Sequence, residues 1–163
     1  MRFRLALFFL SLFSTSSFAA CDSAKFNQFD FWIGEWNVFN QKGKLAGTNS
    51  ITKQLNNCVL EEKYLTPSGY AGQSLNIYKP GTDSWHQTWV DNSGLLLTLE
   101  GQFDGTAMVL SGTTLSPSGY FVLHRITWKP APDKSVRQHW QSSNDKGQSW
   151  KTLFDGKYVK RKK

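Results

Sequence analysis

The sequence predicts an all-β protein in which about ten antiparallel strands form an up-and-down meander closed into a barrel. Short segments of alternating polarity recur from Trp36 almost to the C-terminus, without a long helical period. Each segment ends at turn-forming residues, as in Pro80-Gly81 and Asp104-Gly105. A meander of this length is expected to close, because closure removes the two exposed strand edges.

The expected strands follow one another along the chain, separated by breaks rich in Gly, Pro, Asn and Asp. They cover Glu35–Asn40, Gly47–Leu55, Cys58–Leu65, Gln73–Tyr78, Ser84–Val90, Leu95–Gln102, Ala107–Ser111, Tyr120–Trp128, Ser135–Ser142 and Gln148–Phe154. The last of them can be extended to Val159. Tight turns between successive strands make antiparallel pairing of chain neighbours the simplest arrangement.

The N-terminus has the three-part layout of a secretory signal. Arg2 and Arg4 precede an apolar stretch over residues 5–13, and small and polar residues follow. The apolar stretch is too short to span a bilayer. No later segment is apolar over the length that a transmembrane helix needs, so the chain is not predicted to be transmembrane.

Cleavage after Ala19 would place Ser17 and Ala19 at the two positions that require small residues. We therefore expect residues 1–19 to be a signal peptide and residues 20–163 to be a single exported domain, periplasmic or secreted. The alternative is a lipoprotein signal with Cys21 as the lipidated residue, although Phe18 is a poor match to the aliphatic residue usual three places earlier.

The formal net charge of +7 falls to +5 once Arg2 and Arg4 are removed with the signal. A basic C-terminal tail supplies this excess, and it includes Lys160, Arg161, Lys162 and Lys163. Such a tail is either a solvated chain end or a contact with an anionic surface such as lipid. Nucleic-acid binding is not predicted, because the charges gather in the tail and do not interleave with the tryptophans.

The only two cysteines, Cys21 and Cys58, would both reach an oxidising compartment after export. The simplest prediction is a disulfide that ties the N-terminal segment to an early strand. Their spacing is not a Cys-x-x-Cys redox motif, and no metal site is predicted.

Two expected strands have one face that combines tryptophan with glutamine. Trp85, Gln87 and Trp89 share a face of one strand, and Gln138 and Trp140 share a face of another. Amides buried without partners cost about 1 to 3 kcal/mol each, so these faces suit a cavity for a small molecule. Packing on the barrel exterior or across its end is the alternative.

A charged candidate for the cavity lies on the strand Tyr120–Trp128, where His124 and Arg125 point to opposite faces. Whichever of the two side chains points into the barrel needs a partner of opposite charge, because a buried cation is costly without one. The candidate carboxylates are Glu61, Glu62 and Glu100, and we include Arg125 among the ligand-binding residues.

The step Gly34-x-Trp36, preceded by an aromatic cluster, resembles the first-strand signature of lipocalins and the wider calycin group. In that group the tryptophan closes the barrel base and an arginine from a late strand stacks on it, a part that Arg125 or Arg137 could take here. The chain resembles, over nearly its whole length after the signal, a family of uncharacterised secreted bacterial lipocalin-like proteins. The matching segments are Phe29 to Trp36, Ser74 to Tyr78, Trp85 to Asp91, Val136 to Trp140 and Phe154 to Tyr158.

The segment 143–150 matches the Asp-box pattern Ser-x-Asp-x-Gly-x-(Ser/Thr)-Trp of sialidase blades and other β proteins. Asp145 can accept turn amides, Gly147 can take positive φ, and Trp150 can pack on the hairpin. The motif predicts a stabilising turn without a catalytic role.

No catalytic motif or cofactor motif is present, so we predict no cofactor and favour binding over catalysis. The first alternative uses His86, His124 or His139 inside the barrel, either in an enzyme or as a haem ligand of the nitrobindin kind. The second is an envelope interaction protein with an exposed aromatic patch, to which Phe31 and Trp32 would contribute.

Overall fold

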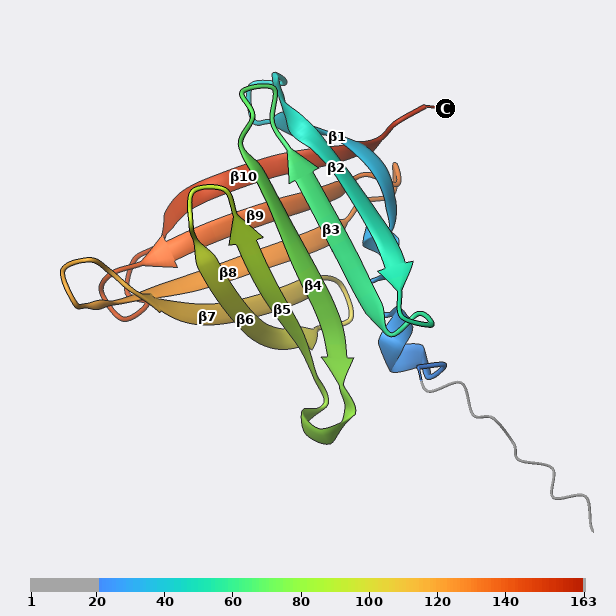
Figure 1. Cartoon of the computed structure of the whole chain (residues 1–163), viewed down its shortest axis with the longest axis horizontal. Helices are drawn as coiled ribbons and strands as arrows, with labels where there is room; N and C mark the ends of the chain where they lie inside the picture. The colour runs from blue at the N-terminus through green and yellow to red at the C-terminus, as the bar shows by residue number, and fades with distance from the viewer. Residues whose placement is uncertain (1–20, 163) are drawn as a thin grey trace, which may run out of the picture.

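The computed structural model describes residues 21–162, which form a closed antiparallel barrel (Figure 1). The ten strands are β1 (Gly34–Asn40), β2 (Leu45–Gln54), β3 (Val59–Leu65), β4 (Ala71–Lys79), β5 (Ser84–Asp91), β6 (Leu96–Phe103), β7 (Met108–Leu115), β8 (Phe121–Pro130), β9 (Val136–Ser143) and β10 (Lys151–Lys160). Each strand pairs with its neighbours in the chain, and β1 pairs with β10 to close the barrel. The predicted all-β meander is confirmed. The predicted signal peptide, residues 1–19, lies outside the described residues.

The largest differences in strand boundaries occur around the turns. β10 begins at Lys151, not at Gln148, because residues 143–150 form a turn in which Asp145 accepts the backbone N–H of Ser149 at 2.9 Å. β7 continues to Leu115, four residues beyond the predicted end, because its second half pairs with β8.

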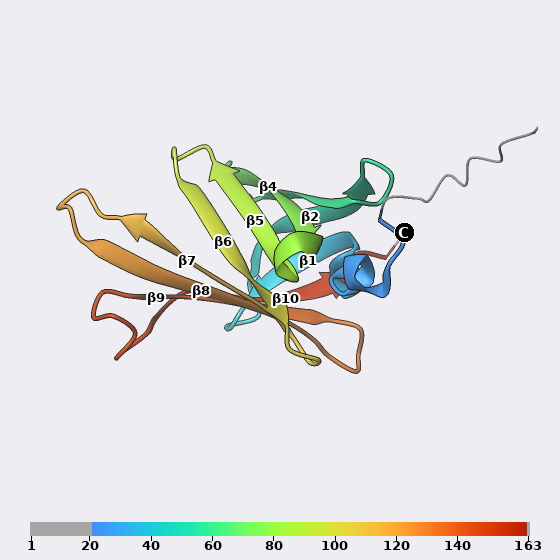
Figure 2. The ribbon, with the colours of Figure 1, turned by 90° about the horizontal axis from the view of Figure 1, so that it is seen from below.

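The N-terminal segment fills one end of the barrel, which we call the plugged end (Figures 1 and 2). It contains two short 3₁₀ helices, η1 (Ala24–Asn27) and η2 (Asp30–Trp32). Its attachments include a T-shaped ring contact between Phe26 and Tyr78 and an ion pair of 2.9 Å between Lys25 and Asp83, which follows the 3₁₀ helix η3 (Pro80–Thr82).

Cys21 and Cys58 form a disulfide, with their Cα atoms 5.1 Å apart. The predicted disulfide is present, and it joins the start of the N-terminal segment to the turn between β2 and β3. Cys58 lies in this turn and not at the first position of the strand, which begins at Val59. The lipoprotein alternative needs the sulfur of Cys21, which is bonded here to Cys58.

A cluster of aromatic rings fills the barrel next to the plugged end. Phe29 and Trp32 stack with their ring centroids 4.9 Å apart, and both rings contact Trp128. Trp85 meets Phe29 edge-on. Trp32 is completely buried, and Phe31 packs partly buried against the same core, so the exposed aromatic patch expected from these two residues is not formed. Their apolar surface is used in closing the barrel.

The cation on Trp36 comes from a lysine and not from the arginine that the resemblance implied. The Lys160 ammonium lies 4.1 Å from the centre of a Trp36 ring and donates to the carbonyl of Ile33. Arg137 pairs instead with Asp155 on the outer face. The antiparallel register explains the exchange, because Trp36 pairs directly with Lys160 at the end of β10. Lys160 therefore belongs to the barrel and not to a free tail.

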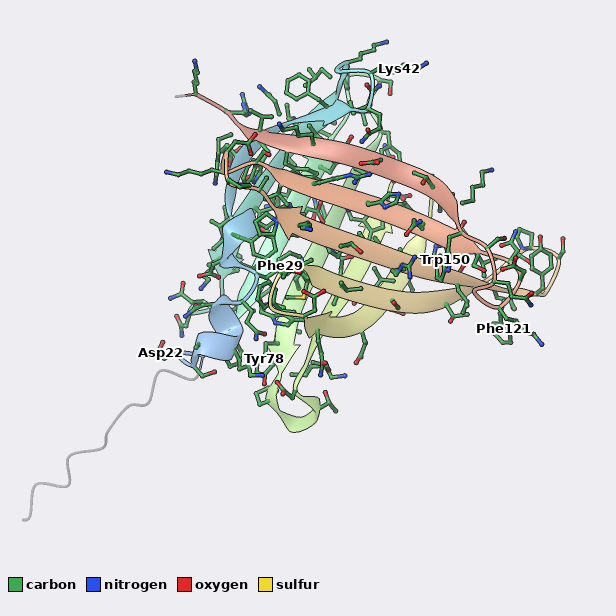
Figure 3. All side chains as sticks on the ribbon, turned by 180° about the vertical axis from the view of Figure 1, so that it is seen from behind. Asp22, Phe29, Lys42, Tyr78, Phe121 and Trp150 are labelled. Atoms are coloured by element: carbon green, nitrogen blue, oxygen red, sulfur yellow. A yellow bond between two sulfur atoms is a disulfide. The ribbon has the colours of Figure 1, made fainter. Side chains whose placement is uncertain are left out.

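The opposite end of the barrel, which we call the open end, is flared between β6 and β7. These two strands pair only from Glu100 with Ser111 to Phe103 with Met108, so half of each strand extends beyond the shared ladder. Figure 2 shows β7 and β8 diverging there from β5 and β6. In Figure 3, Phe29 lies inside the plugged half, while Phe121 and Trp150 lie at the open end.

A closed ten-stranded antiparallel barrel of this kind fits a lipocalin-like fold. Across residues 21–162, no helix has the length and apolar character required to cross a membrane.

Candidate ligand-binding site

A pocket of about 160 Å³ lies inside the open half of the barrel. Its lining is strongly aromatic: it consists of Glu62, Tyr64, Tyr70, Gln87, Trp89, Leu97, Ile126, Gln138, Trp140, Leu153, Phe154 and Tyr158. The aromatic cluster of the plugged half closes the barrel below it, so the pocket has one accessible end. A cavity of about 150 Å³ in another protein holds benzene, so this pocket suits a small molecule with about one ring.

Three of the lining aromatics lie against glycines. A Cβ atom added to Gly72 would come within 2.1 Å of the Trp89 ring, and one added to Gly47 within 2.7 Å of the Tyr64 ring. Phe154 covers Gly156 in the same way, at 2.6 Å. The missing side chains allow the rings to lie close to the sheet, which leaves the lumen free.

The floor of the pocket is polar and centred on Glu62, which is 2% exposed. Asn49 donates to one carboxylate oxygen of Glu62 at 2.7 Å, and the hydroxyl of Ser74 donates to the other at 2.6 Å. Asn49 also donates to the hydroxyl of Tyr158 at 3.2 Å, and that hydroxyl donates to Gln138. The network links five strands, β2, β3, β4, β9 and β10, so it fixes the floor as one unit.

Gln87 completes the floor from β5. Its amide nitrogen donates to Asn76 at 2.9 Å and to Ser74 at 3.3 Å. Since both bonds use the nitrogen, the amide oxygen of Gln87 is the atom that remains for a ligand donor.

Burial raises the pKa of Glu62 to about 7, although hydrogen bonds from Ser74 and Asn49 act in the opposite direction. Desolvation dominates because the carboxylate has no cationic partner within the described residues. The two phenols near it stay neutral, since burial raises the pKa of Tyr64 to about 12 and that of Tyr158 well above its ordinary value. Glu62 is thus the lining group that changes charge near neutral pH.

This shift predicts that the protein loses stability as pH rises. Because the folded-state pKa of Glu62 lies above the unfolded value of 4.5, its favourable contribution is complete below 4.5 and is lost as pH rises through 7. Above pH 8 the loss reaches up to about 3 kcal/mol. Urea unfolding of wild type, Glu62→Gln and Glu61→Gln between pH 5 and 8.5 measures it.

Glu62→Gln is expected to remove that part of the pH dependence, while Glu61→Gln keeps it. Glu61 is a matched control because it is the neighbouring carboxylate on the outer face, paired with Lys63 at 3.0 Å. If the free energy of unfolding changed with pH by the same slope in wild type and Glu62→Gln, the pH dependence could not be assigned to Glu62.

Four of the six residues predicted to bind ligand lie together in the pocket: Gln87, Trp89, Gln138 and Trp140. Trp85 shares the inner face of β5 but lies lower, against Phe29 in the plugged half.

Arg125 lies outside the barrel and not in the pocket. Its guanidinium is 4.2 Å from the centre of a Trp150 ring and donates to Gln141 at 3.0 Å. The alternation along β8 directs His124 and Ile126 inward, and it therefore turns Arg125 outward. None of the three candidate carboxylates pairs with it: Glu62 is the buried floor residue, Glu61 bonds Lys63, and Glu100 bonds Lys79 at 2.7 Å.

The histidines lie apart. His86 is on the outer face beside Glu100, and His139 is on the outer face beside Thr152. His124 is inside, where its Nδ1 accepts the indole N–H of Trp140 at 3.1 Å and its Nε2 is 2.8 Å from the hydroxyl of Thr114. Both ring nitrogens thus have partners, and burial lowers the pKa of His124, so the ring supports Trp140 in neutral form.

Asp91 holds two aromatic rings at the rim. Its carboxylate accepts from the Tyr70 hydroxyl at 2.7 Å and from the Trp89 indole at 3.1 Å, and Ser93 donates to it as well. Burial alone would raise the pKa of Asp91, but the hydrogen bonds from Ser93, Tyr70 and Trp89 together hold it well below its usual range. Asp91 is therefore ionised at neutral pH.

The Asp-box residues form a turn at the open end. Asp145 bonds Ser143 and Ser149, Gly147 has φ +89°, and the Trp150 indole donates to the carbonyl of Gly147 at 3.1 Å. The turn supports the stack of Arg125 on Trp150 and is separate from the pocket lining.

The sequence reasoning missed several lining residues: Tyr64, Tyr70, Leu97, Ile126, Leu153, Phe154 and Tyr158. One usable signal was the alternation Leu60, Glu62, Tyr64 in β3, which places a carboxylate on an otherwise apolar inner face. Glu62 was considered only as a partner for a buried cation.

A scan against models of protein families found no match, and a search of curated proteins found none either.

Proposed function

We propose that this protein is an exported binding protein that holds a small molecule in the pocket at the open end. The observation that carries the proposal is an aromatic pocket above a hydrogen-bonded polar floor. Binding sites of small molecules combine apolar walls with a few polar groups that fix orientation. The ligand accordingly has an apolar body, held by Trp89 and Trp140, and a polar end directed at Gln87, Gln138 and Glu62.

The protein needs no reaction to perform this role, and we propose none. The lumenal histidine has an indole and a threonine hydroxyl as its partners, neither of which acts as an acid or base near neutral pH. The export part of the proposal rests on the disulfide and on the layout of residues 1–19.

Native mass spectrometry of the protein purified from its own host tests both parts. We expect a chain that begins at Ala20 and carries a disulfide, and an additional mass from a co-purified ligand. The variant Ile126→Phe enlarges a buried lining side chain and is expected to lose the ligand.

The control is Leu75→Phe, which makes a similar enlargement at an exposed position outside the barrel and should retain the ligand. Equal ligand occupancy in the two variants would contradict binding in the pocket. A chain that still contains residues 1–19 in the host would contradict export.

A further inference from the structure

The pocket is acidic although the chain as a whole is basic. None of its twelve lining residues is Lys, Arg or His, while Glu62 lies at the floor. Asp91 adds a second carboxylate, bonded to the lining residues Tyr70 and Trp89. A ligand inside the pocket therefore meets one acidic lining side chain, Glu62, and no basic one, and the second carboxylate lies behind the rings of Tyr70 and Trp89.

The pocket walls add to this preference for positive charge. Indole and phenol rings attract cations over their faces, by about 0.5 to 1 kcal/mol at exposed sites and about 2 or more when the cation is desolvated. The aromatic residues that line the pocket include Trp89, Trp140, Tyr64 and Phe154. The same rings also cover an apolar body, so they suit a molecule that combines an aromatic group with a cation.

The floor distinguishes a donor-rich cation from one without donors. From the described residues the Glu62 carboxylate accepts one bond on each oxygen, from Asn49 and Ser74, and the amide oxygen of Gln87 is also an acceptor. A carboxylate oxygen can accept more than one hydrogen bond, and an ammonium group carries three donors. A primary ammonium fits these acceptors, whereas a carboxylate ligand would face Glu62 with like charge.

We infer that the ligand is a small primary amine on an aromatic or apolar body, bound as its ammonium with Glu62 as the counter-ion. This inference rests on the proposed binding function and specifies its ligand class. A partner charge is what an ionised buried carboxylate requires, so bound ammonium and ionised Glu62 stabilise each other.

Among the described residues that face Glu62, no other group titrates near neutral pH. They are Asn49 on β2, Ser74 on β4, Gln87 on β5, Gln138 on β9, and the phenols of Tyr64 on β3 and Tyr158 on β10. Both phenols have raised pKa values and remain neutral. Amine affinity is therefore expected to increase with pH as Glu62 ionises.

Calorimetric titration with 2-phenylethylamine, 2-phenylethanol and 3-phenylpropanoate tests the inference, because the three probes share one ring and differ in the charge of the head group. At pH 8 we expect wild type to bind the amine at least about tenfold more tightly than the alcohol, with the acid weakest. Between pH 8 and pH 6 the amine affinity should fall about tenfold, as protonation of Glu62 requires, while the alcohol affinity stays constant.

Glu62→Gln should remove the preference for the amine over the alcohol and the pH dependence of amine affinity, and the outer-face control Glu61→Gln should behave as wild type. The pH series on wild type tests the same point without any substitution. Binding of the alcohol or the acid as tightly as the amine at pH 8 would overturn the inference and leave the binding function standing. Failure of all three probes to bind would overturn both.

Discussion

Replacing Trp32 by Ala is expected to lower the free energy of unfolding by about 3 to 5 kcal/mol. The side chain is completely buried and has Phe29, Trp128 and Tyr158 as ring neighbours. Its removal would leave a cavity where the N-terminal segment meets the barrel, because the surrounding rings come from that segment, from β8 and from β10. Because ordinary domains have only about 5 to 15 kcal/mol of stability, urea unfolding should show a much earlier midpoint.

Two further variants test whether the loss of stability comes from the packing of the buried ring. Phe121→Ala removes a ring that is 72% exposed at the open end and should change stability by no more than about 0.5 kcal/mol. Trp32→Phe should lower the free energy of unfolding less than Trp32→Ala, because it keeps an aromatic ring in the cluster. The indole N–H that it removes has no partner among the described residues, so no hydrogen bond is lost. A Trp32→Ala protein as stable as Phe121→Ala would show that the aromatic cluster does not stabilise the N-terminal segment in the plugged end.

The fold was predictable because strand and turn signals are local. Two-residue alternation places Trp85, Gln87 and Trp89 on one face, and the structure retains that face as the inner one. Position along the barrel axis is not a local property. Trp85 and Trp89 share a face, yet Trp85 belongs to the plugged half and Trp89 to the pocket, because the N-terminal segment fills only one end.

When both faces of a strand are apolar, the face that points into the barrel was equally hard to predict. In β8 both the series with His124 and the series with Arg125 contain large side chains, so periodicity did not choose between them. On the outer face Arg125 meets the ring of Trp150, a residue beyond the next strand, and no pattern within β8 reveals that contact.

The floor of the pocket depends on contacts between distant segments. Asn49 and Tyr158 are 109 residues apart in the chain and are joined by a hydrogen bond because β2 and β10 both flank β1 in the closed barrel. No pattern within one strand encodes such a contact. The acidic residue was visible in the sequence, but the fact that Glu62 lacks a cation could be learned only from the assembled sheet.

Replacing Cys58 by Ser is expected to lower stability by about 3 to 4 kcal/mol under oxidising conditions, because the bridge to Cys21 closes a loop with a sequence separation of 37. For a domain of this size the melting temperature should fall by about 10 °C. Under reducing conditions wild type and variant should melt together, since neither then has the bridge. Scanning calorimetry with and without reductant provides the comparison.

The double variant Cys21→Ser/Cys58→Ser is the control for a reactive leftover thiol, and it should match Cys58→Ser in both conditions. A loss of equal size with and without reductant would mean that Cys58 acts by packing against the core and not through its bond.

The loss of stability expected without the disulfide follows from the way the N-terminal segment is attached to the barrel. Lys25 and Phe26 hold η1 to the barrel through noncovalent contacts alone, whereas the disulfide limits how far the whole segment separates from β2 and β3 when those contacts break. Loss of the bridge should therefore open the plugged end before the strands separate, and amide hydrogen exchange should show the largest gain in residues 24–32.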